Sequence, residues 1–278
     1  MAIALIIGLL FAVGCSADLK EETSPKSLDS SGTIMTNTDG KAETVKIEDL
    51  SLYFTGYDGT FILFDKNLGE YTIYNKLKSE KRVSPCSTFK IVNSLIGLET
   101  GVIQDENSIY QWDGKKRSIE EWNKDHTLAS AVKSSVVWYF QKLAISVGTE
   151  RMQSYLDKID YGNRDISGGI DQFWLQSTLE ISPIEQIEML RKLYDYQLPF
   201  SKRNIDIVKM IIIDSKEAGV TLSGKTGSGG AVNGWFVGYV EKADNIYFFA
   251  TNIEGEKEAN GAKAKEITKN ILKDKKIL

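Results

Sequence analysis

Ser87 and Lys90 stand three residues apart in Ser87-Thr88-Phe89-Lys90, where a loop joins an apolar segment. Residues three apart on a helix share a face, so the hydroxyl and the amine are expected to point the same way. A serine hydroxyl is a weak nucleophile until an adjacent base takes its proton, and Lys90 is placed to be that base or to carry one. The spacing also occurs by chance in many chains, so the rest of the sequence has to decide.

Two further short elements follow in order, Ser135-Val136-Val137 and Lys225-Thr226-Gly227. Serine acyl-transfer enzymes of the penicillin-recognising type use their parts in this order. Ser135 is predicted to relay a proton toward the leaving amine. Lys225 is predicted to supply positive charge to a substrate carboxylate and to hydrogen-bond Ser135. Each element alone is weak, but the three in order favour a catalytic site.

The residues after Lys225 are predicted to bind substrate. Thr226 offers a hydroxyl to the same carboxylate, and Gly227 is expected to keep the strand clear so that a ligand lies along it. The backbone N–H groups of Ser87 and Ser228 are predicted to hold the developing oxyanion.

Composition excludes several other kinds of site. His126 is the only histidine, so a metal site built on two or three imidazoles is impossible, and we expect no metal. We interpret His126 as structural, near a helix start capped by Asp125 or Thr127. The net charge of −4 gives no reason to expect a nucleic acid partner.

The catalytic elements need a scaffold, and the patterns predict an α+β fold over residues 49–278. Alternating residues predict strands at both ends of this region, including one at Ser51–Thr55, and helical spacing predicts a mostly helical segment over residues 106–148. Ser182 and Pro183 open a further predicted helix. Together these predict a central antiparallel sheet flanked by helices, with an all-helical subdomain and the active cleft between them.

Residues 1–15 are predicted to be a lipoprotein-type signal peptide, with Cys15 as the lipidated residue, although no Lys or Arg precedes the apolar run. The alternative is a simple cleaved signal that ends near Ala17. Residues 16–48 are polar and are interpreted as a flexible tether. In both cases we expect an exported, periplasmic protein, either free or lipid-anchored to a bacterial membrane.

The sequence resembles the class D (oxacillinase-type) serine β-lactamases over nearly the whole chain after the tether. The resemblance rests on the three elements above and on four more segments: Trp112-Asp113-Gly114, Tyr161-Gly162-Asn163, Phe173-Trp174-Leu175 and Gly234-Trp235-Phe236-Val237-Gly238. It implies a serine β-lactamase and penicillin-binding-protein-like fold, and hydrolysis of a β-lactam through an acyl-enzyme on Ser87. Monomer and homodimer are both left open.

The resemblance also implies that Lys90 is carboxylated by carbon dioxide or bicarbonate to N6-carboxylysine, with no other cofactor. Burial makes this plausible, because it destabilises the ammonium and frees the neutral amine. The indole N–H of Trp174 would support the carbamate. The apolar walls around Lys90 are predicted to be Phe89, Val137, Trp174 and Leu175. Val137 and Trp112 are also predicted to bind substrate.

One position departs from the family. The arginine that usually holds the substrate carboxylate falls at Ala264, and Lys263 or Lys265 is expected to substitute as a point charge. The range of substrates, whether oxacillins, carbapenems or cephalosporins, is therefore left open.

Two alternatives belong to other functional classes. A penicillin-sensing receptor domain would be acylated by the β-lactam without releasing product. We disfavour this alternative because the sequence shows one apolar amino-terminal segment and no cytoplasmic protease region. A cell-wall transpeptidase is disfavoured by Tyr161-Gly162-Asn163 and Phe173-Trp174-Leu175.

Overall fold

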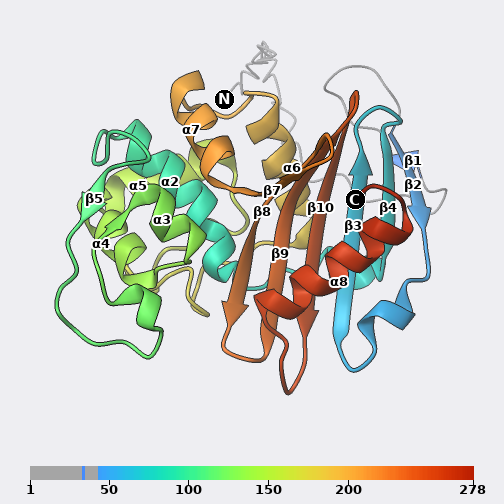
Figure 1. The fold of residues 1–278 in the computed structure, drawn as a ribbon, viewed down its shortest axis with the longest axis horizontal. Coiled ribbons are helices and arrows are strands. Elements are labelled where there is room, and N and C mark those ends of the chain that lie inside the picture. Colours follow the sequence, from blue (N-terminus) through green and yellow to red (C-terminus); the bar gives the residue numbers. More distant parts are fainter. Residues whose placement is uncertain (1–32, 35–42) are drawn as a thin grey trace, which may run out of the picture.

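The computed structural model describes residues 33–34 and 43–278, which form one large sheet with helices on both faces and a helical subdomain beside it (Figure 1). The predicted signal peptide lies outside the described residues. In the described part of the chain, no helix combines the length and apolar character needed to cross a membrane.

The sheet has eight strands in the order β1-β2-β4-β3-β10-β9-β8-β7. Its strands are β1 (Thr33–Ile34), β2 (Glu43–Ile47), β3 (Asp58–Asp65), β4 (Glu70–Tyr74), β7 (Ile213–Glu217), β8 (Val220–Gly229), β9 (Asn233–Lys242) and β10 (Asn245–Glu254). All neighbours pair antiparallel except β2 and β4, which are parallel. Because β3 pairs with β10, the two ends of the chain build one sheet, as the patterns predicted.

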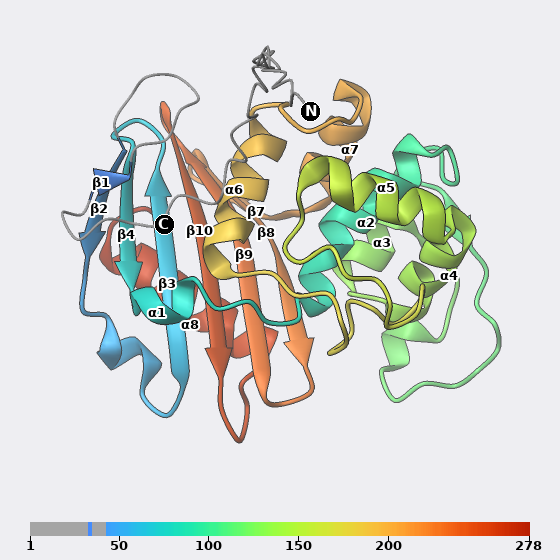
Figure 2. The ribbon, with the colours of Figure 1, turned by 180° about the vertical axis from the view of Figure 1, so that it is seen from behind.

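The helices are α1 (Lys76–Ser79), α2 (Lys90–Glu99), α3 (Leu128–Lys133), α4 (Val137–Val147), α5 (Thr149–Ile159), α6 (Pro183–Tyr194), α7 (Lys202–Ile211) and α8 (Gly261–Asp274). Helix α8 covers one face of the sheet and α6 the other, while α2, α3, α4, α5 and α7 form the subdomain next to β7 and β8 (Figures 1 and 2). This confirms the predicted α+β fold.

Helix α6 begins as the sequence predicts. The Ser182 hydroxyl accepts a hydrogen bond from the N–H of Glu185, and the Glu185 carboxylate accepts one from the N–H of Ser182. Pro183 occupies the first turn, where its missing N–H costs nothing. The predicted start at Ser182 and Pro183 is thus confirmed.

Three local predictions are wrong. The 3₁₀ helix η1 (Ser51–Phe54) replaces the strand expected at Ser51–Thr55. Residues 106–127 are mostly loop, with the short strands β5 (Ile109–Tyr110) and β6 (His126–Thr127) and the 3₁₀ helix η3 (Glu120–Trp122), because Asp and Asn side chains here cap backbone N–H groups in turns. The predicted tether is wrong for Glu43–Ile47, which form β2.

The placement of β2 has a tertiary cause. Its residues pair with β4, and the Glu43 carboxylate forms an ion pair with Arg191 of α6 at 2.6 Å. A short polar segment of this kind carries little local strand signal, so only its partners reveal it.

Candidate active site

The predicted nucleophile lies in a short 3₁₀ helix, η2 (Cys86–Phe89), that leads directly into α2. Lys90 is the first residue of α2, so its side chain returns over the preceding turn. Lys90 Nζ and Ser87 Oγ are 2.6 Å apart and hydrogen-bonded. The structure therefore brings together the two residues that the spacing placed on one face, and a neutral amine at this distance is within reach of the hydroxyl proton.

The amine of Lys90 lies in an apolar pocket. Lys90 is fully buried, and its Nζ is 5.4 Å from the centre of the Phe140 ring. Burial holds the pKa of Lys90 well below its usual range, and the nearby charge of Lys225 lowers it further. Burial thus favours the neutral amine, which is the form that accepts a proton or reacts with an electrophile.

Trp174 closes one side of this region. Its ring is fully buried and lies 5.7 Å, centre to centre, from the ring of Phe89, the residue before Lys90. The indole N–H is buried and meets no acceptor among the described residues. A buried donor without a partner costs about 1–3 kcal/mol, so this N–H is open to an acceptor that the protein itself does not supply within the described residues.

A second pair of catalytic candidates lies across the cleft. Lys225 Nζ donates to Ser135 Oγ at 3.0 Å, as the sequence predicted, and to the backbone carbonyl of Thr226 at 3.1 Å. Ser135 has a φ of 54°, a left-handed conformation that is rare for serine and is found often at active sites. The loop between α3 and α4 thus presents the Ser135 hydroxyl to the sheet edge.

Lys225 lies on a part of β8 that only β9 pairs. The pairing of β7 with β8 ends at Ser223, which leaves the residues from Lys225 onward at a free edge. Burial and, to a smaller extent, the charge of Lys265 lower the pKa of Lys225, the carboxylate of Asp214 raises it, and the net pKa is about 7. Lys225 therefore exchanges between ammonium and amine near neutral pH.

Gly227 lies close to the nucleophile turn. A Cβ at this position would meet the carbonyl oxygen of Pro85 at 2.9 Å and the side chain of Thr88 at 3.2 Å. The glycine therefore allows β8 to approach this turn, and the expectation that it keeps the strand clear for a ligand stays a prediction. The hydroxyl of Ser228 accepts a hydrogen bond from the N–H of Gly261, which ties this end of β8 to the start of α8.

A cavity of about 550 Å³ opens beside Lys225 and Thr226. Its walls include Lys265, Asp214 and Phe236, and Lys265 forms an ion pair with Asp214. Lys265 is therefore one of the cations that surround this cavity.

The structure separates the two candidates for the missing arginine. Ala264, at the arginine position, is fully buried under the sheet. Lys263 forms an ion pair with Glu266 at 2.7 Å and does not line the cavity. Lys265 lines it, next to Lys225, and is the better placed replacement.

The structure gives no direct support for the predicted roles of Val137, Leu175 and Trp112. Val137 is half-buried at the start of α4, and Leu175 is half-buried against the core. The backbone N–H of Trp112 donates to the Asp125 carboxylate, and its indole N–H donates to the carbonyl of Lys115. Their substrate-binding and wall roles stay predictions.

His126 is structural, as predicted. Its ring is buried, with Nδ1 2.9 Å from the hydroxyl of Ser130 and Nε2 2.9 Å from the carbonyl of Glu121. Thr127, and not Asp125, caps α3. Both ring nitrogens are therefore occupied, which removes His126 from the catalytic chemistry.

Sequence reasoning missed two contributors to the site. Phe140 contacts the Lys90 amine from α4, and Ser84 hydrogen-bonds the backbone of Trp174. The partner of Phe140 is Lys90, and the partner of Ser84 is Trp174. Both partners are distant in the sequence, so no local pattern could have assigned either contact. Among the described residues, no group of three or more His, Cys, Asp and Glu side chains is arranged to hold a metal ion.

Comparisons with known proteins agree with this geometry. Residues 59–273 match the family described as penicillin binding protein transpeptidase domain. The chain is 48% identical over 222 residues to the probable β-lactamase YbxI of Bacillus subtilis (strain 168), covering 79% of this chain and 82% of that protein. The solved structure of class D β-lactamase BAT-2 is 44% identical, with a TM-score of 0.80, over 83% of this chain and 97% of that one.

A third relative has a different description. The regulatory protein BlaR1 of Bacillus licheniformis is 45% identical over 239 residues, which are 84% of this chain but 40% of that protein. The chain belongs to the penicillin-binding transpeptidase family and, within it, to the class D serine β-lactamases.

Proposed function

We propose that this chain hydrolyses the β-lactam amide of penicillins and related antibiotics through an acyl-enzyme on Ser87, and so gives antibiotic resistance. The observation that carries this is the 2.6 Å hydrogen bond between Ser87 and a fully buried Lys90. A nucleophile and base within hydrogen-bond reach are what covalent acyl transfer requires.

In acylation, Ser87 Oγ bonds to the β-lactam carbonyl carbon and gives up its proton to the base at Lys90. The ring C–N bond breaks, and the leaving nitrogen receives a proton through the hydroxyl of Ser135, which Lys225 orients. Deacylation repeats the pattern with water: the ester to Ser87 breaks, the hydroxyl is restored and the ring-opened acid leaves. The N–H groups of Ser87 and Ser228 are assigned to the oxyanion.

We also propose that the working base is Lys90 in its carboxylated form. Carbon dioxide joins the neutral amine with loss of one proton, and the carbamate so formed supplies the oxygens that accept a proton from Ser87 and then from water. The supporting observations are the depressed pKa of Lys90 and the acceptor-free indole N–H of Trp174, as seen among the described residues. Lys90 would carry the group, and the indole N–H of Trp174 would donate a hydrogen bond to it.

The substrate carboxylate is assigned to Lys225, Thr226 and Lys265. Support comes from the cavity that these three residues share. Two point charges in place of the arginine fork give less geometric selectivity, so binding here depends more on charge than on orientation.

Export, and anchoring through a lipid on Cys15, are proposed from the amino-terminal pattern alone. Globomycin-sensitive processing of the chain and its recovery in the membrane fraction would support the lipid. A Cys15→Ala chain that still fractionates with membranes would contradict it.

A penicillin-sensing receptor domain is the second candidate, because BlaR1 is 45% identical over the matched region. The two functions differ in whether the acyl group leaves. Hydrolysis of a chromogenic cephalosporin, followed with and without added bicarbonate, tests them directly. Sustained turnover that bicarbonate increases supports the β-lactamase and the carbamate, whereas a stoichiometric burst without turnover would contradict the hydrolase and leave the sensor and the transpeptidase to be distinguished.

A further inference from the structure

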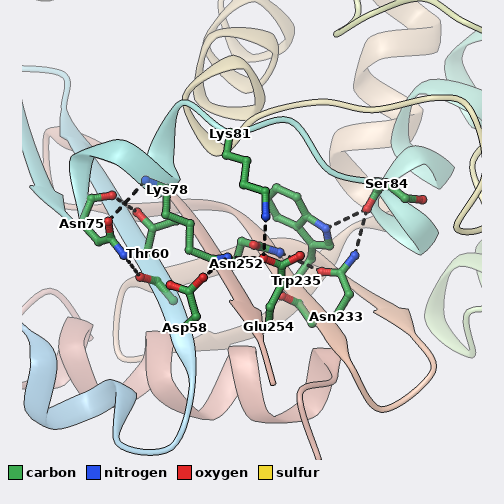
Figure 3. Close-up of polar contacts among 12 residues, drawn as sticks. Asp58, Thr60, Asn75, Lys78, Lys81, Ser84, Asn233, Trp235, Asn252 and Glu254 are labelled. Carbon is green, nitrogen blue, oxygen red and sulfur yellow. Dashed lines mark hydrogen bonds and ion pairs between the residues drawn. The ribbon is translucent and has the colours of Figure 1, made fainter. Parts of the chain in front are cut away.

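Ser84, three residues before the nucleophile, joins segments that are far apart in the sequence. Its backbone carbonyl accepts hydrogen bonds from Trp235 Nε1 at 3.0 Å and from Asn233 Nδ2 at 3.2 Å, both on β9 (Figure 3). Asn233 is held in turn by Asn252 of β10, whose Nδ2 donates to Asn233 Oδ1 at 2.9 Å. The sheet therefore fixes the main chain just before Ser87.

The side chain of Ser84 does different work. Its hydroxyl donates to the carbonyl of Trp174 at 3.0 Å and accepts from the N–H of Gln176 at 2.9 Å. Ser84 is half-buried, so water competes little for these two bonds. One hydroxyl thus spans both sides of Leu175.

The same loop is attached at two further points. Ile181 and Val83 exchange two backbone hydrogen bonds of 3.0 and 3.1 Å, and Gln176 Nε2 donates to the carbonyl of Gly229 at 3.2 Å. The loop of residues 174–181 therefore contacts the segment before the nucleophile at its start, through Ser84, and again at its end, through Val83. Of these attachments, the Ser84 hydroxyl is the one that contacts the backbone of Trp174 itself.

The position of that backbone matters because the Trp174 ring is fully buried, and its N–H meets no acceptor in residues 43–278. A buried ring whose main chain is fixed has few rotamers left, so its N–H direction is set before any acceptor arrives. A shift of this backbone would change the direction of the unpartnered N–H.

We propose that Ser84 is a positioning residue, whose hydroxyl couples the nucleophile turn to the Trp174 backbone and thereby fixes the indole N–H that retains the carbamate on Lys90. This rests on the proposed carboxylation of Lys90. Ser84 touches neither substrate nor the reacting atoms, so its effect should appear in bicarbonate affinity and deacylation and not in the chemistry of a fully carboxylated enzyme.

The test compares Ser84→Ala with Ser84→Thr, which keeps a hydroxyl. We expect Ser84→Ala to need about tenfold more bicarbonate for half-maximal turnover, since losing one well-made hydrogen bond in a buried setting changes an equilibrium by about that factor. At saturating bicarbonate, its acylation burst should stay within about twofold of the parent. Ser84→Thr should recover most of the affinity.

Ser79→Ala is the matched control, because the buried hydroxyl of Ser79 also donates to a backbone carbonyl, that of Lys76, but in α1. Its bicarbonate requirement should equal that of the parent. Thermal unfolding of all variants separates lost stability from lost positioning, and an equal shift in requirement for Ser79→Ala and Ser84→Ala would overturn the proposal.

A readout independent of activity is the ¹³C NMR signal of the protein in ¹³C-bicarbonate, titrated for each variant. A weaker carbamate signal in Ser84→Ala at low bicarbonate supports the role of Ser84. A parent signal that persists unchanged in Ser84→Ala would overturn only that role, whereas a parent protein without any carbamate signal would overturn the carboxylation and this inference together.

Discussion

Lys90 and Lys225 are both buried lysines whose pKa lies below the ordinary value, but their surroundings differ. Lys90 is fully buried beside the ring of Phe140 and hydrogen-bonds the Ser87 hydroxyl. Lys225 borders a cavity that also holds Lys265 and Asp214. Burial favours the neutral form of Lys90, whereas burial and the opposing charges of Lys265 and Asp214 leave the pKa of Lys225 at about 7.

Lys78 shows what a buried lysine looks like when it only stabilises the fold. It forms ion pairs with Asp58, at 3.0 Å, and with Glu254, at the other end of the polar network that reaches Ser84 (Figure 3). Carboxylate partners of this kind offset the cost of burying a lysine side chain. Burial alone therefore does not make a lysine reactive, and the informative difference is that no described carboxylate forms an ion pair with Lys90.

The largest expected effect comes from Lys90→Ala. Removing the proposed base should lower kcat by about 10³-fold, within the usual range for general base catalysis, and should abolish the response to bicarbonate. Steady-state turnover of a chromogenic cephalosporin across a bicarbonate titration measures both. Lys78→Ala is the matched control: it should lower the melting temperature and leave the bicarbonate response intact. Parent-level turnover by Lys90→Ala would sink the mechanism.

Trp174→Phe sharpens the account of the Lys90 pocket, because it keeps an aromatic ring and removes the N–H. We expect about tenfold weaker bicarbonate affinity, with deacylation slowed more than acylation, and a larger effect for Trp174→Ala. Burst kinetics resolve the two steps. Without bicarbonate, Trp174→Phe should lower the melting temperature, because a smaller ring leaves a cavity in the core, so bicarbonate affinity is compared at a temperature at which both proteins are folded. An unchanged bicarbonate requirement would refute the carbamate role.

The smallest effect concerns pH at the charged cavity. The ammonium form of Lys225, which a substrate carboxylate needs, predominates below its pKa of about 7, so kcat/KM for a carboxylate substrate should fall as pH rises through this value. Lys265→Met removes a neighbouring positive charge, which raises the Lys225 pKa and should move this limb to higher pH by roughly half a unit. Asp214→Asn should move it the opposite way.

Lys263→Met is the control for that shift, because Lys263 pairs with Glu266 away from the cavity. The pH profile of kcat/KM is measured for all four proteins. If the fall in kcat/KM occurs at the same pH in the parent, Lys265→Met and Asp214→Asn, the charges in the cavity do not control the pKa of Lys225.

The sequence by itself determined the parts with local physics. Helical spacing put Ser87 and Lys90 on one face, the capping residues marked the start of α6, and a single histidine excluded a metal site built on several imidazoles. The order of the three catalytic elements was enough to expect the Lys225–Ser135 contact across 90 residues.

Only the tertiary structure decided features that depend on partners distant in the chain. It showed that Glu43–Ile47 form a strand of the sheet and that Gly227 lies close to Pro85. It also showed that Lys265, and not Lys263, lines the cavity. It also showed the carbonyl and hydroxyl of Ser84 joining the sheet to the Trp174 loop. Hydrogen bonds and burial between segments so far apart leave no periodic trace in a sequence, because each partner satisfies only its own local pattern.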